Sequence, residues 1–349
     1  MSLSPIFGHD AVRNRLAGAV ASSRLPQVLL FEGPRGVGKQ RLALWLAQLL
    51  LCERRNATAT EPCGECHPCR LVGTLSHPDV HWFVPLELEK RGADADKQVE
   101  LVAEALAEEM ATRRDQPLYD APGGLATHSM AAVRLLLRRL AVTPAMATRK
   151  VFIVGDAERL IPQRANPEAA NALLKALEEP PADTVFILTA AEPEALLPTI
   201  LSRVIRVRIP RLQDSVVTAF VQKKLSGTAV ALGSGVAAAE GCIGRLVSQS
   251  GNDGKAAAEA AAGFLSAARH HGARRYATAL GQAPFQARGA FSAMLDALLD
   301  RLRVEARAGG ADRVVTAIAQ VMAARDAAQG NVNPQLLTAV LADDLAAAR

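Results

Sequence analysis

The sequence predicts an α/β unit built on a parallel sheet, followed by an all-helical part. Half of the 349 residues are hydrophobic while only 4% are aromatic, a balance that favours helix-rich or α/β proteins over β-sandwiches. Short apolar runs alternate with helical patterns through the first two thirds of the chain, and one run leads through a glycine-rich turn into a helix. Beyond Pro210 no strong strand pattern remains.

Composition sets further bounds. The chain is long enough for two or three domains with ample cores. Its net charge of +5 permits contact with nucleic acid or another acidic partner, but solvated basic faces give the same balance. The first residues lack the charged start and apolar run of a signal peptide, and no uncharged apolar stretch approaches the roughly 20 residues that span a bilayer. We therefore expect a cytoplasmic protein that has reduced thiols and no membrane contact.

Buried strands and helices are expected to alternate up to residue 209. Apolar runs predict strands at 28–31, 151–154, 185–188 and 204–209. Helical periodicity predicts helices at 12–24, from Lys39 to about 50, at about 96–114, at about 130–141, and from near Pro167.

Two segments depart from this rhythm. Residues 86–128 are highly charged and end in a turn-rich stretch, so we interpret them as a surface insertion in the α/β domain. After the last strand, residues 212–252 are expected to form a small helical domain, and 253–349 several alanine-rich helices. Asn333 is the expected cap of the last helix, with Pro334 in its first turn.

The run Gly33-Pro34-Arg35-Gly36-Val37-Gly38-Lys39 matches the phosphate-binding loop pattern GxxxxGK. Glycines let backbone N–H groups surround a phosphate and the lysine reaches the outer phosphates, so Gly33, Gly38 and Lys39 are the candidate nucleotide-binding residues. The alternative is a strand-to-helix turn that binds nothing. Residue 40 is Gln, where a magnesium-binding Ser or Thr normally stands.

The strand at 151–154 shows a second departure. In an intact P-loop ATPase it would end in Asp-Glu, with the Asp holding magnesium and the Glu orienting water. Here Gly155 takes the place of the Asp and Asp156 that of the Glu, although a slip of one residue would return Asp156 to the metal. Two altered magnesium positions in one chain predict that it does not hydrolyse nucleotide efficiently.

Four of the five cysteines fall within 18 residues: Cys52, Cys63, Cys66 and Cys69. Four thiolates in a reducing compartment predict a closed, tetrahedral, structural zinc site. The alternatives are coincidental clustering, or a histidine (His67, His77 or His81) in place of Cys52. The fifth cysteine, Cys242, is expected to be a packing residue.

Several motifs together resemble the bacterial DNA polymerase III clamp-loader family, and within it the delta-prime subunits. The most specific are NALLKALEEPP at 171–181 and LLPTILSR at 196–203. The opening at 6–9, Arg24-Leu25-Pro26, the cysteine cluster and His77-Pro78-Asp79 agree with them. The resemblance covers about residues 5–83 and 129–210. It is weak over the helical C-terminal third, apart from 333–337, and the insertion at 86–128 has no counterpart.

This resemblance implies an AAA+ fold in three parts: an ATPase-like domain at 1–211 with a zinc module at 52–69, a helical lid at 212–252, and a helical collar at 253–349 that holds a five-membered ring together. It also implies that Arg203 is an arginine finger acting on the neighbouring subunit's ATP. The family's Ser-Arg-Cys is Ser202-Arg203-Val204 here, so the cysteine is missing while the arginine remains. The alternative is an exposed arginine at the start of a strand.

Two other family positions are altered or uncertain. The lid arginine that touches the subunit's own nucleotide is replaced by Gly244, with Arg245 one step further along. Thr189 matches the polar sensor residue, and a role as a strand cap remains open. Whether ATP or ADP binds also remains open, because Lys39 and the glycines allow it while Gln40 weakens any magnesium-assisted affinity.

The function expected from this resemblance is that of a non-hydrolysing, stator-like accessory subunit. Its partners would be the gamma/tau and delta subunits, the sliding clamp, and primed DNA within the complex. One alternative is the ATP-hydrolysing motor subunit, which would need Ser or Thr at position 40 and Asp-Glu at 155–156. Another is a zinc-ribbon module that binds nucleic acid or protein. No aromatic residue lies between Cys52 and Cys69, which favours docking of partner subunits over nucleic acid.

Overall fold

The structure is a computed structural model. It describes residues 6–56, 59–87, 94–119, 126–160, 167–225, 234–250, 252–270, 272–281, 289–307, 309, 312–328 and 332–347. Parts of the charged insertion (88–93 and 120–125) and of the predicted lid (226–233) lie outside these residues. Among the described helices, none is long and apolar enough to cross a membrane.

The chain forms two compact units. The first consists of Met1–Pro122, Ala126–Ser226 and Ala239–Arg245, and the second of Gly123–Leu125, Gly227–Ala238 and Leu246–Arg349. The division into domains at residues 211 and 252 stays a prediction.

A five-stranded, all-parallel sheet forms the centre of the first unit, in the order β2-β3-β4-β1-β5. Residues of β3 and β4 are buried throughout, as expected for parallel strands that helices cover on both faces. The fifth strand, β2, is not predicted from the sequence because His81 interrupts its apolar pattern. The strands are β1 (Val28–Glu32), β2 (Val80–Phe83), β3 (Lys150–Val154), β4 (Thr184–Ala190) and β5 (Ile205–Arg208).

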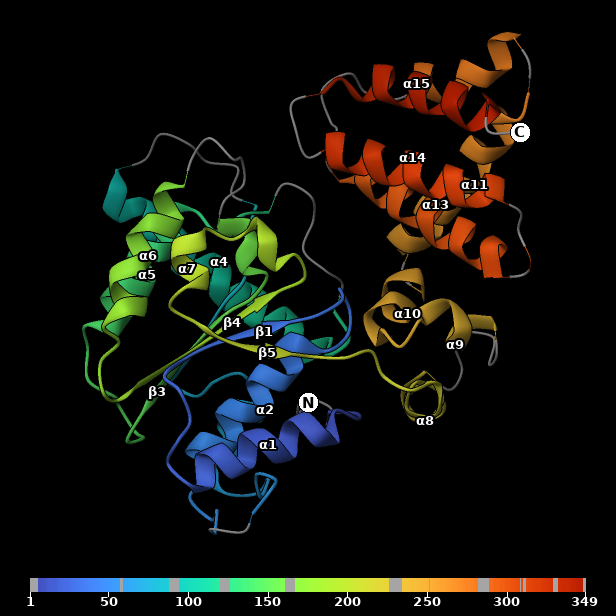
Figure 1. The fold of residues 1–349 in the computed structure, drawn as a ribbon. Coiled ribbons are helices and arrows are strands. Elements are labelled where there is room, and N and C mark those ends of the chain that lie inside the picture. The colour runs from blue at the N-terminus through green and yellow to red at the C-terminus, as the bar shows by residue number, and fades with distance from the viewer. Residues whose placement is uncertain are drawn as a thin grey trace. The chain divides into compact units, whose positions relative to one another are not determined.

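Helices cover both faces of the sheet. In Figure 1, α1 and α2 lie below the sheet, while α5, α6 and α7 lie above it. The predicted α/β fold class is therefore confirmed. The helices between the strands of the sheet unit and before them are α1 (Asp10–Ala21), α2 (Lys39–Leu51), α3 (His67–Gly73), α4 (Ala95–Asp115), α5 (Met130–Leu140), η1 (Ala157–Leu160), α6 (Glu168–Glu178), η2 (Pro193–Ala195) and α7 (Pro198–Leu201).

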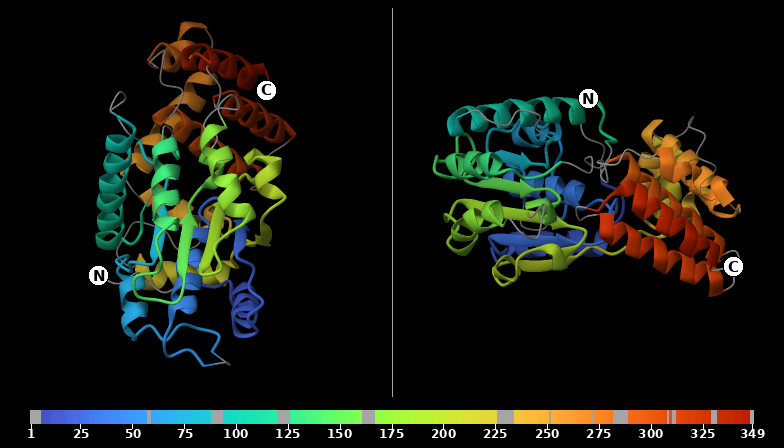
Figure 2. Two further views of the ribbon diagram at one scale, coloured as in Figure 1. Left: turned by 90° about the vertical axis from the view of Figure 1, so that its left-hand side faces the viewer. Right: turned by 90° about the horizontal axis from the view of Figure 1, so that it is seen from above.

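Helix α4 belongs to the charged insertion, yet it contributes to the core. Val99, Val102 and Leu106 lie one helical turn apart and join the main hydrophobic cluster of the sheet unit. Both views in Figure 2 show α4 (teal) beside α5 (green). The surface insertion predicted from the sequence thus has one solvent-exposed face and one face that is part of the fold.

The helices after β5 are α8 (Asp214–Lys224), α9 (Ser234–Ala239), α10 (Ile243–Ser250), α11 (Asn252–Ala268), η3 (Gly272–Tyr276), α12 (Ala277–Gly281), α13 (Ala290–Arg307), α14 (Asp312–Ala328) and α15 (Pro334–Ala347). In the second unit, α11, α13, α14 and α15 share one core that includes Phe264, Leu295 and Val321. The predicted cap of the last helix is confirmed, because Asn333 Oδ1 accepts the backbone N–H of Gln335 at 2.8 Å.

Candidate functional site

The glycine-rich loop lies between β1 and α2, as the sequence predicts. Gly36 and Gly38 have φ angles of 78° and 105°, which L-residues with side chains rarely adopt. Lys39 is buried, and its Nζ donates hydrogen bonds to the carbonyls of Gly33 (2.8 Å) and Pro34 (3.0 Å). Burial lowers the pKa of Lys39, although the Glu158 and Asp156 carboxylates oppose this effect. The lysine that would reach a phosphate is thus bonded to its own loop.

The start of α10 packs directly on this loop. The N–H of Gly244 donates to the carbonyl of Gly36 at 2.8 Å. A Cβ on residue 244 would lie 2.6 Å from the Cα of Gly36, so only glycine permits this approach of the two backbones. In the family that this chain resembles, this position carries an arginine. Here it is Gly244, whose backbone contacts the glycine-rich loop.

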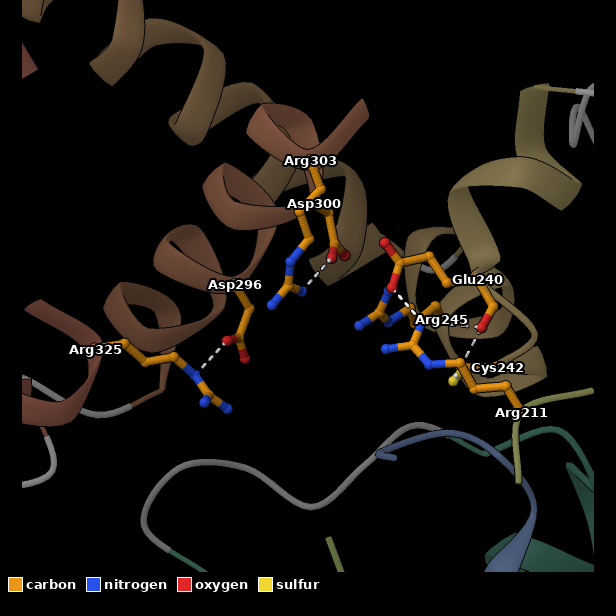
Figure 3. A network of polar contacts seen from close by, with 8 residues as sticks. All are labelled: Arg211, Glu240, Cys242, Arg245, Asp296, Asp300, Arg303 and Arg325. Atoms are coloured by element: carbon orange, nitrogen blue, oxygen red, sulfur yellow. Dashed lines mark hydrogen bonds and ion pairs between the residues drawn. The ribbon is translucent and has the colours of Figure 1, made fainter. Parts of the chain in front are cut away.

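Arg245, the next residue, is held away from this position by an acidic neighbour. Figure 3 shows Arg211 and Arg245 both directed at Glu240, at N–O distances of 2.5 and 2.8 Å. The Glu240 side chain is only 7% exposed, so its charge is compensated by these two guanidinium groups. The ion pairs fix the loop before α10 in the place from which it contacts the glycine-rich loop.

Gln40 and Gly155 are neighbours in space. A Cβ on residue 155 would lie 2.9 Å from the terminal amide of Gln40, so that amide fills the space beside the end of β3. Gln40 Nε2 donates to Asp156 Oδ2 at 3.0 Å, and Gln40 Oε1 accepts from Arg113 of α4 at 3.3 Å. The two positions that differ from P-loop ATPases, 40 and 155, thus pack against each other.

The end of β3 is held by further buried polar groups. Thr189 Oγ1 accepts the N–H of Asp156 at 3.0 Å, so Thr189 caps this strand end. His128 Nε2 lies 2.7 Å from the carbonyl oxygen of Gly155, and burial lowers the pKa of His128 to about 4. Burial, followed by the nearby Asp156 carboxylate, raises the pKa of Glu158.

The four predicted zinc ligands come together in one cluster. The sulfur atoms of Cys52, Cys63, Cys66 and Cys69 all lie within 4.8 Å of one another, and those of Cys63 and Cys69 are 3.9 Å apart. Four sulfurs around a zinc ion with Zn–S bonds of about 2.3 Å would be separated by about 3.8 Å. The cluster therefore fits a tetrahedral metal ion, and no histidine is needed to complete it.

Backbone groups prepare this cluster for metal. The N–H of Cys63 points at Cys52 Sγ (3.4 Å) and that of Cys66 at Cys63 Sγ (3.3 Å). N–H donation from Cys66 and Glu65 lowers the pKa of Cys63 to about 6, which favours the thiolate that a metal requires. Burial raises the pKa of Cys69.

The cysteine module is fastened to α2. Gln48 Nε2 donates to the carbonyl of Cys69 at 2.8 Å, and Trp45 Nε1 donates to Glu61 Oε2 at 2.7 Å. Arg13 of α1 adds an ion pair with Glu61 at 2.6 Å. The module therefore sits on the two helices that cover one face of the sheet.

Arg203 lies two residues beyond the end of α7. Its NH1 donates to the Thr199 carbonyl (2.8 Å) and the Ser202 hydroxyl (3.2 Å). Its NH2 forms an ion pair with Glu178 of α6 at 3.2 Å, and the arginine side chain is 29% exposed. The guanidinium is thus held by local groups while part of it faces solvent.

The contacts of three side chains, Arg113, Glu178 and Asp79, do not follow from the sequence patterns. Arg113 is one of many charges in the insertion, and no spacing marks it. Glu178 lies in the NALLKALEEPP run, so that run was the available signal. Asp79 accepts the N–H groups of residues 145–147 at 2.6–2.9 Å and was signalled only by the His77-Pro78-Asp79 motif.

The chain is similar to proteins of known family. The chain is 35% identical over 181 residues to DNA polymerase III subunit delta′ of Pseudomonas aeruginosa, a match that covers 52% of this chain and 42% of that protein. It is 31% identical over 192 residues to subunit delta′ of Bacillus subtilis, covering 55% and 44%. The chain thus covers less than half the length of these relatives.

A solved structure of a DNA polymerase III gamma subunit-related protein from Thermotoga maritima superposes with a TM-score of 0.44 at 16% identity, covering 96% of this chain and 99% of that one. A family model described as DNA polymerase III, delta subunit, matches residues 8–213, which is more than half of the chain. The chain therefore belongs to the DNA polymerase III delta-subunit family represented by these delta′ relatives.

Proposed function

We propose that this chain is a stator-like, non-hydrolysing delta-prime subunit of a DNA polymerase III clamp loader. In this proposal it assembles with gamma/tau and delta subunits and helps to place the sliding clamp on primed DNA. Membership of the family supports the assignment to this complex. The observation that carries the non-hydrolysing role is the contact between Gln40 and Gly155.

The residues at this contact do not fit a magnesium–nucleotide complex. P-loop enzymes hold the ion with a hydroxyl after the lysine and a carboxylate on a neighbouring strand. Here an amide stands in the first place, and the same amide fills the space where a side chain at 155 would project. The bonding of Lys39 to Gly33 and Pro34 and the Gly36–Gly244 contact support the same conclusion.

Arg203 is proposed to act on the ATP of a neighbouring subunit. Its Glu178 partner is itself 57% exposed, and ion pairs of this kind contribute only about 0–1 kcal/mol. The guanidinium is therefore easily transferred to a phosphoryl group presented by another chain. There it would stabilise the charge that develops on the transferred phosphoryl group.

Residues 253–349, which fall in the second unit, are proposed to be the collar that joins the ring. Val315 and Met322 on α14, and Leu336 and Val340 on α15, are exposed apolar side chains, at 47–62% of their full area. Each pair lies on one side of its helix, at spacings of seven and four residues. Contact with equivalent helices of partner subunits would remove these side chains from water.

The cysteine module is proposed to hold zinc in a structural role. Four thiolates leave no open coordination position for substrate. Its attachment to α1 and α2 makes it a rigid surface feature, which suits docking of a partner subunit.

Two measurements test the proposed function. The purified chain should show no ATP turnover above background, because no magnesium site is formed. In a reconstituted loader, Arg203→Ala should leave assembly intact while lowering DNA-stimulated ATP turnover at the site it serves, by as much as about 10³-fold. Rapid turnover by the isolated chain, or unchanged turnover in the Arg203→Ala loader, would overturn the proposal.

A further inference from the structure

Arg113, on the inserted helix α4, is a buried charged side chain that two aromatic rings and a carboxylate surround. Its side chain is 2% exposed. The guanidinium carbon lies 4.5 Å from the ring centre of Trp82 and 4.1 Å from that of Tyr119, and Nε donates to Glu109 Oε1 at 2.7 Å. Because an unpaired buried charge costs several kcal/mol, these contacts are what allow the arginine to stay there.

The end of this side chain reaches the altered magnesium site. Arg113 NH1 donates to Gln40 Oε1 at 3.3 Å, and Gln40 Nε2 donates to Asp156 Oδ2 at 3.0 Å. A hydrogen-bonded path therefore runs from the insertion, through the residue after the P-loop lysine, to the carboxylate at the end of β3. Donors and acceptors alternate along this path: the guanidinium donates to the amide oxygen, and the amide N–H donates to the carboxylate.

We infer that Arg113 takes the place of the divalent cation that P-loop proteins hold at this position. Arg113 pairs directly with the Glu109 carboxylate of α4 and, through Gln40, with the Asp156 carboxylate after β3, while Lys39 faces Glu158. Buried or half-buried carboxylates of this kind require a compensating positive charge. In P-loop enzymes a metal ion supplies that charge. Here the insertion supplies it as a covalently attached guanidinium, which is not released and needs no nucleotide to hold it.

This assignment gives the insertion a function. The apolar face of α4 packs into the core through Val99, Val102 and Leu106, and the same helix carries Arg113 to the site about two to four turns further on. The insertion thus places a positively charged side chain, Arg113, at the altered magnesium site. Neither Arg203 nor assembly of a ring enters this inference, so it can be tested on the isolated chain.

The first test is to remove the charge and offer a metal ion. In Arg113→Met the side chain keeps its apolar contact with the two rings but loses its charge. We expect the zinc-loaded variant to bind one Mn²⁺, detected as loss of the free Mn²⁺ paramagnetic resonance signal, at least tenfold more tightly than the wild type. Arg114→Met, which removes the adjacent, half-exposed arginine, and Arg113→Lys, which keeps a cation, should behave like the wild type. Equal Mn²⁺ binding by the wild type and Arg113→Met would overturn the inference.

The second test does not require Arg113→Met to fold. The double variant Gln40→Thr/Gly155→Asp restores the two ligands of a magnesium site while Arg113 remains. We expect it to bind Mn²⁺ no better than the wild type, because Arg113, whose NH1 lies 3.3 Å from Gln40 Oε1 in the wild type, would move into the space left by the Gln40 amide and pair with the new carboxylate. If this double variant binds Mn²⁺ at least tenfold more tightly than the wild type, Arg113 does not exclude the ion and the inference fails.

Discussion

Glu178 at the end of α6 and Arg203 beyond α7 form an ion pair with an N–O distance of 3.2 Å. This pair connects the two most specific family motifs of the chain. We predict that Glu178→Gln changes the free energy of unfolding by no more than about 1 kcal/mol, because the Glu178 side chain is 57% exposed and the pair is partly solvated. In a reconstituted loader it should lower ATP turnover, but less than Arg203→Ala does, because the arginine remains while one of its holding contacts is weakened.

Urea unfolding and steady-state ATPase assays check this prediction. Glu179→Gln is the matched control, since it removes the adjacent carboxylate and leaves the ion pair intact. A loader with Glu178→Gln that is as inactive as one with Arg203→Ala would show that Glu178 does more than position the arginine.

The contact between Gly155 and Gln40 predicts non-additive substitutions. Gly155→Ala places a Cβ 2.9 Å from the Gln40 amide. Gln40 can move, but it then loses its hydrogen bonds with Asp156 and Arg113, so we expect destabilisation of about 1–2 kcal/mol. In a Gln40→Ala background the same substitution should cost much less, because the space is empty. A double-mutant cycle from thermal or urea unfolding measures this coupling, and simple additivity would contradict it.

The Gly36–Gly244 contact predicts that a single methyl group separates the two segments. Gly244→Ala brings a Cβ to 2.6 Å from backbone, which cannot be relieved by rotating a side chain. We expect a loss of about 1–3 kcal/mol of stability and faster hydrogen exchange at the backbone amide of residue 244. Gly18→Ala is the control: nothing lies within 4 Å of its added Cβ, and Ala in the interior of α1 should stabilise by about 0.5–1 kcal/mol. Unchanged exchange in Gly244→Ala would show that the contact is not maintained in solution.

Loss of a cysteine should release the metal and loosen its module. We expect one zinc ion per wild-type chain and loss of tight zinc binding in Cys63→Ser, measured with a chromophoric chelator. Without the ion, the hydrogen bond between Trp45 and Glu61 should weaken, and tryptophan fluorescence should shift to longer wavelength. Cys242→Ala should retain the zinc, because Cys242 lies outside the cluster. Retention of zinc by Cys63→Ser would contradict the four-thiolate site.

Asp79 predicts a pH-dependent contribution to stability. Burial, the largest influence, raises the pKa of this carboxyl, but N–H donation from Ala145, Ala147 and Met146 outweighs it, so the pKa lies below its ordinary value of 3.8. A carboxyl with a lowered pKa in the folded state stabilises above the unfolded pKa, and this contribution is lost as pH falls through the folded value. Asp79→Asn should therefore cost about 3 kcal/mol at neutral pH, with the difference from wild type shrinking below about pH 4. A difference that grows on acidification would contradict this assignment.

The sequence predicts four of the five strands and the cysteine cluster because each is marked by local pattern. Strands β1, β3 and β4 are nearly continuous apolar runs, whereas β5 alternates apolar residues with Arg206 and Arg208. Four clustered cysteines leave few alternatives to a metal site. Strand β2 is not predicted, since His81 lies where an apolar side chain is expected. In the structure the ring of His81 packs on Phe152 of β3, and burial lowers its pKa to about 4, so the neutral ring serves as an apolar residue.

The candidate site is predicted only in part, for a different reason. Gln40 and Gly155 each stand out against the P-loop pattern, but 115 positions separate them and nothing local shows that one fills the space beside the other. Arg113 is harder still, since its partners Trp82, Tyr119 and Gln40 come from three different segments. A charged residue in a charged helix has no signature until the fold shows which face is buried.

Helix α2 has two unlike ends. It begins at Lys39 of the glycine-rich loop and ends at Leu51, directly before the first cysteine of the cluster, so about 20 Å of buried helix joins them. Oxidation of the thiols would loosen the contacts of the cysteine module with the C-terminal end of α2, while packing on the sheet would hold the rest of the helix. Damage to the cysteine cluster would then stay local, and the segment of Arg203, which follows α7 on the opposite face of the sheet, would keep its place.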